Sequence, residues 1–191
     1  FFLSNLSFVD VCFSSTTVPK VLAIHILRNQ AILYSGCLTQ LYFLCVFADM
    51  DNFLLAVMAY DRFVAICHPL HYTTKMTHQL CAFLVVGSWM VASLNALLHT
   101  LLVAQLYFCG DNVIPHFFCE VTPLLKLSCS DTHLNELMIL AVAGLIMLAP
   151  FVCILLSYIL IACAILKISS TGRWKAFSTC GSHLTIVFLF Y

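Results

Sequence analysis

Long apolar segments separated by short polar ones run through the whole chain. Four of them reach the roughly 20 residues that an α-helix needs to cross the hydrocarbon core of a bilayer, and a fifth stops in mid-pattern at the last residue. The predicted spans are approximately residues 1–27, 37–60, 79–106, 137–166 and 176–191. The chain begins on an apolar residue without an initiator Met, so we expect further helices on both sides of this sequence. The pattern predicts an all-α membrane protein with a single transmembrane domain over residues 1–191.

The composition supports a membrane protein and argues against several other functional classes. The chain is 63% hydrophobic and 8% charged, and its mean hydropathy is +1.05. A soluble domain of this length could not cover its surface with so few polar side chains. The formal net charge of zero offers nothing for neutralising phosphates, which argues against binding of nucleic acid. No arrangement of a nucleophile with a base and no glycine-rich phosphate loop occurs, so we predict no enzyme and no catalytic residue.

The charges of the connectors predict which side of the membrane each one occupies. The connectors 62–78 and 167–175 are basic and are predicted to be cytoplasmic by the positive-inside rule. The connector 107–136 carries more acidic than basic residues. The short connector 28–36 falls on the same side of the membrane, because successive connectors alternate between the two sides. We therefore place these two connectors outside the cell, in a multi-pass membrane protein.

Cysteine usage agrees with this orientation. Of eleven Cys, seven lie in or beside apolar spans or the inner connector, where they usually behave as small hydrophobic residues. The remaining four are predicted to be outside the cell, and four oxidisable cysteines allow three pairings that the residues alone do not rank. An alternative is a zinc site, but the candidate ligands lack a closely spaced pair. The four outer cysteines are Cys37, Cys109, Cys119 and Cys129, and the zinc alternative would use Cys109, His116, Cys119, Cys129 or His133.

Three carboxyl side chains fall inside predicted spans, where a charge is costly. Asp51 precedes Arg62 by eleven residues, about three helical turns, so the two share a face that we expect to point into the protein. Asp49 lies about 200° around the helix from Asp51 and aligns with Cys45 and Asn52. This stripe is expected either to contact an adjacent helix or to border a ligand cavity at its upper part.

Several motifs together resemble the olfactory receptors, a branch of the rhodopsin-like G-protein-coupled receptors. They are FFLSNLSFVDVCFSSTTVPKVL at 1–22, MAYDRFVAICHPLHY at 58–72, HFFCE at 116–120, the pair Ser157–Tyr158, and KAFSTCGSHL at 175–184. The resemblance implies a seven-transmembrane helix bundle, of which this chain would cover helices two to five and the start of six. It also implies the disulfides Cys37–Cys119 and Cys109–Cys129.

The resemblance implies a function as well: binding of small volatile hydrophobic odorants and activation of a stimulatory, olfactory-type heterotrimeric G protein. Activation and coupling would involve Asp61, Arg62, Tyr158 and Leu70, with Phe63 standing where the family expects a tyrosine. The stretch from His68 to His71 would meet the G protein, or would only turn the chain between helices. The implied ligand pocket comprises Leu44, Cys45, Ala48, Ile139, Val142, Ala143, Ile146 and Tyr191.

Two questions stay open at this point. Asp10 matches the acid that contributes to a sodium pocket in rhodopsin-like receptors, so Asp10 and Asp51 are predicted either to hold a sodium ion or to belong to a hydrogen-bonded structural network. No other cofactor is expected. The intramembrane carboxyl groups also raise the alternative of an ion- or proton-coupled transporter, although the internal repeats usual in transporters are missing. A truncated, non-functional receptor copy is a further alternative.

Overall fold

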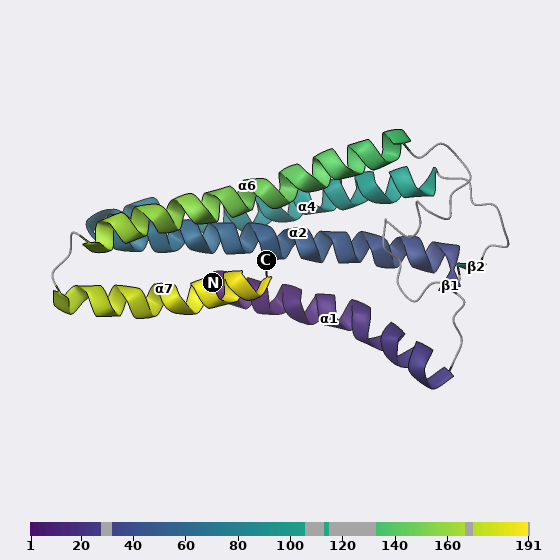
Figure 1. The fold of residues 1–191 in the computed structure, drawn as a ribbon, viewed down its shortest axis with the longest axis horizontal. Coiled ribbons are helices and arrows are strands. Elements are labelled where there is room, and N and C mark those ends of the chain that lie inside the picture. Colours follow the sequence, from purple (N-terminus) through teal and green to yellow (C-terminus); the bar gives the residue numbers. More distant parts are fainter. Residues whose placement is uncertain (28–31, 106–112, 115–132, 167–169, 191) are drawn as a thin grey trace. The chain divides into compact units, whose positions relative to one another are not determined.

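Five long helices make up most of the structure. The computed structural model describes residues 1–27, 32–105, 113–114, 133–166 and 170–190 (Figure 1). The long helices are α1 (Phe2–Leu27), α2 (Tyr34–Cys67), α4 (His78–Ala104), α6 (His133–Leu166) and α7 (Ser170–Phe190). The predicted all-α fold class is confirmed, and each predicted span corresponds to one of these helices.

Short elements fill two of the connections. The 3₁₀ helix η1 (Pro69–His71) and the single-turn helix α3 (Tyr72–Lys75) join α2 to α4. Two strands of two residues each, β1 (Ile32–Leu33) and β2 (Val113–Ile114), pair in antiparallel register. The residue pattern did not predict this strand pair, because two residues are too few to show an alternation of apolar and polar side chains.

Helix α2 continues beyond its predicted span. The apolar pattern ends at Tyr60, but the helix runs on to Cys67, so the first six residues of the predicted 62–78 connector are helical. The pattern marks the part of a helix that crosses the hydrocarbon core, whereas backbone hydrogen bonding carries the helix past a charged pair. Pro69 then stops α2, because proline cannot donate the hydrogen bond that a helix interior requires. The hydroxyl of Thr77 accepts a hydrogen bond from the Leu80 backbone N–H at 3.2 Å and caps the start of α4.

Three helices in the described part of the chain are long and apolar enough to cross a membrane: Ser35–Cys67, His78–Ala104 and Glu136–Leu166. A shorter apolar stretch occupies Cys180–Phe190 of α7. Large apolar side chains are exposed along these helices, for example Phe83, Leu140 and Phe188. In a bilayer such side chains contact lipid chains, so their exposure is expected in a membrane-spanning protein.

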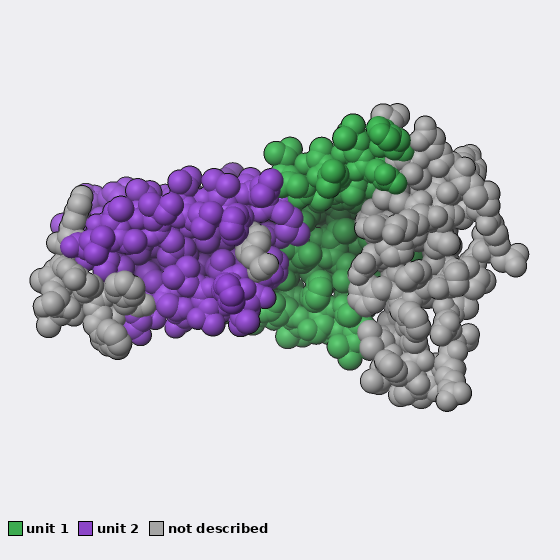
Figure 2. Space-filling model, viewed as in Figure 1, with its two compact units in different colours: residues 1, 3–51, 88–146 green, residues 2, 52–87, 147–191 purple. Residues whose placement is uncertain are grey.

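The chain forms two compact units, which Figure 2 draws in separate colours. Unit 1 comprises residues 1, 3–51 and 88–146, and unit 2 comprises residues 2, 52–87 and 147–191. Fully buried side chains such as Val9, Met50 and Val103 form the interior of unit 1. Leu54, Leu55, Ile154 and Ile161 have the same role in unit 2.

Candidate functional site

The acidic residue of the Asp-Arg pair has a partner on the short helix that follows α2. The Tyr72 hydroxyl on α3 donates a hydrogen bond of 2.8 Å to Oδ1 of Asp61 on α2. This hydrogen bond is the largest cause of a raised Tyr72 pKa, and partial burial and the charge of Asp61 add to it. Tyr72 therefore stays a hydrogen-bond donor at physiological pH, and the bond fastens the connection to the end of α2. The MAYDRFVAICHPLHY motif contains Tyr72, but sequence reasoning gave it no role.

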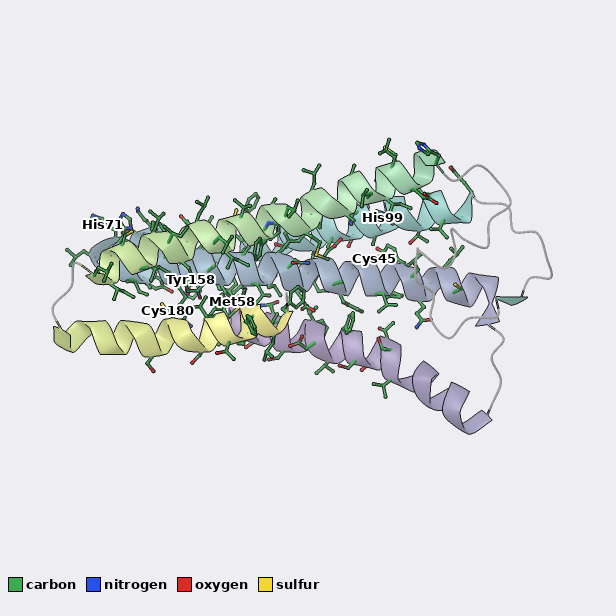
Figure 3. All side chains as sticks on the ribbon, viewed as in Figure 1. Cys45, Met58, His71, His99, Tyr158 and Cys180 are labelled. Carbon is green, nitrogen blue, oxygen red and sulfur yellow. The ribbon has the colours of Figure 1, made fainter. Side chains whose placement is uncertain are left out.

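A second pair links α6 to α7 within unit 2. The Tyr158 hydroxyl on α6 is hydrogen-bonded to Nδ1 of His183 on α7, and the two rings stack with their centroids 5.8 Å apart. His183 is only 3% exposed. The side chain of Arg62 lies close enough to interact electrostatically with Tyr158, His183 and Cys180. Figure 3 labels Tyr158 and Cys180, which lie between α6 and α7.

Arg62 is free to act on this pair. Within the part of the chain that the structure describes, Arg62 forms no ion pair with Asp61 or with another carboxylate. Its guanidinium keeps five donors and a fixed charge beside the Tyr158–His183 hydrogen bond. Sequence reasoning named Arg62 and Tyr158 but missed His183, although His183 lies inside the quoted KAFSTCGSHL motif.

Phe63 occupies an apolar environment. Its ring packs against a buried cluster of Ile161, Ile165 and Cys180 and lies edge-on to the His68 ring at 5.7 Å between centroids. A phenylalanine satisfies these contacts without a hydroxyl that needs a partner. The departure from the family's tyrosine is therefore compatible with the local packing.

Leu70 projects from η1 and is 91% exposed. An isolated exposed leucine is unremarkable in itself. It lies in the connection between α2 and α4, two residues before Tyr72, the residue that is hydrogen-bonded to Asp61. It is the apolar side chain of η1 most open to a partner.

The described residues of the predicted ligand pocket all belong to unit 1 and are all half-buried. Three lie on α2 and four on α6, and Tyr191 lies outside the described residues. An apolar groove of about 390 Å³ is found in unit 2 instead, where it involves none of the predicted pocket residues. Its walls are Ala56, Val57, Tyr60, Phe63, Leu84, Cys153, Leu156, Ser157 and Leu160.

The stripe that includes Asp49 contacts neighbouring helices. In unit 1, Nδ2 of Asn95 on α4 donates a hydrogen bond of 2.7 Å to Oδ2 of Asp49, and both side chains are buried. In unit 2, Nδ2 of Asn52 lies 3.0 Å from the sulfur of Met147 on α6. Of the two interpretations of this stripe, contact with adjacent helices is the one that the geometry favours. Asn95 had no signal in the sequence, because a single asparagine in an apolar helix does not reveal its partner.

The predicted sodium pair lies in unit 1. Asp51 is 6% exposed, its Oδ1 atom has no hydrogen-bond partner among the described residues, and Asp10 is close enough to interact with it electrostatically. Two carboxyl groups with an unpaired buried oxygen suit a small cation in their donor chemistry. Among the described residues there is no group of three or more His, Cys, Asp or Glu placed to hold a metal ion.

Cys37 is disulfide-bonded. The other three outer cysteines, and His116 of the zinc alternative, lie outside the described residues, so the pairings Cys37–Cys119 and Cys109–Cys129 stay predictions. The seven cysteines that were assigned to spans or to the inner connector are all free thiols.

Comparison with known proteins gives a consistent result over the whole chain. A family model described as "Olfactory receptor" matches residues 1–191. The chain is 77% identical to olfactory receptor 1f45 of Rattus norvegicus and 72% identical to olfactory receptor 1F1 of Homo sapiens. It is 58% identical to olfactory receptor 1E16 of Mus musculus. Each comparison covers 100% of this chain but only 61–62% of the relative, so the chain spans about three fifths of the length of these relatives.

Proposed function

Because this chain belongs to the olfactory receptor family, we propose that the full-length protein binds small volatile hydrophobic odorants and activates a stimulatory, olfactory-type heterotrimeric G protein. The family consists of multi-pass plasma-membrane receptors with a seven-transmembrane bundle, and its members are not enzymes. The activity, ligands and partners of the whole receptor belong to the proposal, since the chain covers only part of it.

The arrangement of Arg62, Tyr158 and His183 carries the proposal of G-protein activation. The Tyr158–His183 hydrogen bond joins α6 to α7, and the Arg62 guanidinium on α2, which forms no ion pair with a described carboxylate, lies beside it. When an odorant shifts α7, this bond breaks, Tyr158 turns toward Arg62, and the opened end of the bundle receives the G protein. Pro150 lies inside α6 eight residues before Tyr158 and removes one backbone hydrogen bond, which makes the helix easier to bend there.

The walls of the proposed ligand cavity support a hydrophobic odorant. All seven described candidates lie in spans and are half-buried, and six of them have purely hydrocarbon side chains, the exception being the Cys45 thiol. A cavity of this kind binds by shape and dispersion, with few polar groups to fix orientation. Leu70 would contact the G protein as the exposed apolar side chain of η1. Asp10 and Asp51 would hold a sodium ion that favours the inactive bundle.

Odorant-dependent production of cyclic AMP tests the proposal. The full-length receptor that contains this chain is expressed with an olfactory-type stimulatory G protein, and surface receptor is quantified by an N-terminal epitope. A panel of volatile alcohols, ethers, aldehydes and esters is expected to include agonists that raise cyclic AMP. Leu70→Asp is expected to reduce this response at equal surface expression, whereas Leu97→Ala, at an exposed site on α4, should leave it unchanged. A receptor that reaches the surface and responds to no volatile compound would contradict the proposal.

A further inference from the structure

A row of polar side chains on α2 faces a second row on α4 within unit 1. Cys45 and Asp49 are one turn apart on α2, and Asn95 and His99 are one turn apart on α4. The two helices run in opposite directions (Figure 1), and the Asn95–Asp49 hydrogen bond of 2.7 Å fixes their register. Cys45 and His99 are therefore expected at the same level, one turn away from that bond, and Figure 3 draws them so.

Two atoms of this polar row lack partners. Oδ1 of Asn95 and Nδ1 of His99 are buried and make no hydrogen bond with any residue that the structure describes, and the two side chains are only 8% and 4% exposed. Buried polar atoms in folded proteins are almost always paired. Lipid chains cannot supply the missing hydrogen bonds inside a membrane. A bound polar group would supply the hydrogen-bond partners that these two atoms lack.

The unpaired atoms belong to the same polar row as Cys45, which is a residue of the proposed ligand pocket. Cys45 is one of the three cavity residues proposed on α2, and its thiol lies close enough to Asp49 to interact with it electrostatically. The other cavity residues on α2 are Leu44 and Ala48, which are apolar and half-buried. The polar row would thus supply hydrogen-bonding groups beside the apolar Leu44 and Ala48. Whether its unpaired atoms donate or accept hydrogen bonds then restricts which ligands can bind there.

Resting on the odorant-binding function proposed above, we infer that Asn95 and His99 bind the hydroxyl group of an alcohol odorant. The amide oxygen of Asn95 is an acceptor, so it requires a donor from the ligand. Nδ1 of a neutral His99 donates when it carries the proton. A hydroxyl group satisfies both atoms at once, because it donates to Asn95 and accepts from His99. An ether satisfies His99 alone, and an alkane satisfies neither.

Three matched probes separate the two contacts: the alcohols from hexanol to decanol, the methyl ether of each, and the alkane of equal length. Binding is measured on the purified full-length receptor in detergent, from the rise in melting temperature with probe concentration. In the parent receptor we expect the alcohol to bind about fivefold more tightly than the ether, and the ether about fivefold more tightly than the alkane, as one hydrogen bond each would give.

Each leucine variant is expected to abolish one of these two differences in affinity. Asn95→Leu should make alcohol and ether equal, and His99→Leu should make ether and alkane equal. His99→Gln keeps a donor and should restore most of the ether-over-alkane preference, which a purely structural role of His99 would not require. Leu97→Ala, at an exposed position of the same helix, is the matched control and should change neither ratio. Since Asn95→Leu also removes the bond to Asp49, the His99 variants keep the test valid if that protein fails to fold.

The results distinguish this inference from the proposed function. Equal affinities for alcohol and ether in the parent receptor, or ratios that stay unchanged in both the Asn95 and the His99 variants, would overturn the alcohol site. Unchanged ratios together with reduced thermal stability would assign a bound water to the two atoms and would likewise overturn it. Selective alcohol binding without any cyclic AMP response would refute the proposed signalling function but leave the alcohol site intact.

Discussion

The hydrogen bond between Asp49 and Asn95 should contribute measurably to the stability of the receptor. Its length of 2.7 Å and the burial of both side chains place it among the stronger contacts between helices. Such bonds in membrane proteins average about 0.6 kcal/mol and reach about 1.7 kcal/mol, so we expect a coupling in the upper half of this range, about 1–1.7 kcal/mol. The substitution Asn95→Ala alone should cost about 1–3 kcal/mol, since it leaves a buried carboxyl group without its partner.

A double-mutant cycle of Asp49→Ala and Asn95→Ala measures this coupling directly. Free energies of unfolding come from titration of the purified receptor with SDS in mild-detergent micelles. Thr100→Ala provides the matched control on α4, because within the described chain the Thr100 hydroxyl bonds to the Ala96 carbonyl of its own helix, at 2.7 Å, and to no other helix. Its coupling with Asp49 should lie within the roughly 0.3–0.5 kcal/mol by which independent sites add. A coupling for the Asp49–Asn95 pair that is no larger than this control value would refute the assignment of the bond as a stabilising contact.

Three further predictions follow from the remaining polar sites. Peptide mapping of the full-length receptor without reduction should recover Cys37 joined to Cys119, and Cys119→Ser should reach the cell surface poorly, because loss of a native disulfide typically costs about 2–5 kcal/mol. Asp10→Asn and Asp51→Asn should each abolish any dependence of agonist potency on sodium, whereas an unchanged sodium response would favour a structural network. Tyr72→Phe should lower stability by about 0.5–1.5 kcal/mol at pH 7. Since the Tyr72 pKa is raised in the folded protein, its hydrogen bond should be fully present below pH 10 and lost as pH rises through the raised pKa, so the two proteins should converge in stability under strongly alkaline conditions.

The apolar pattern was sufficient to predict the helices because membrane crossing imposes a length and a composition on each of them. It was not sufficient to predict where a helix ends. Helix α2 passes Asp61 and stops only before Pro69, since its end depends on backbone hydrogen bonding and on the proline rather than on hydropathy. The pairing of β1 with β2 was likewise invisible, as it joins connectors that are far apart in sequence.

Contacts between helices were the least predictable part of the candidate site. The rotation of α2 could be inferred from the spacing of Asp49 and Asp51, but the partner of Asp49 depends on the depth and rotation of α4, which no residue pattern in that helix specifies. The motifs pointed to Arg62 and Tyr158. They did not point to His183, because its hydrogen bond to Tyr158 depends on the packing of α7 against α6.

Signalling by Arg62→Ala at matched surface expression tests the central claim most directly. Arg62 lies beside the Tyr158–His183 bond in unit 2, whereas the described ligand residues belong to unit 1, so its loss should impair coupling rather than odorant binding. Allosteric couplings of this kind are typically about 1–3 kcal/mol, equivalent to a loss of potency of about 5- to 150-fold. The account predicts that Arg62→Ala binds the parent's odorants with affinity reduced no further than that coupling allows, yet produces little cyclic AMP. Normal cyclic AMP production by this variant would contradict the account, as would an odorant-dependent ion flux that requires no G protein.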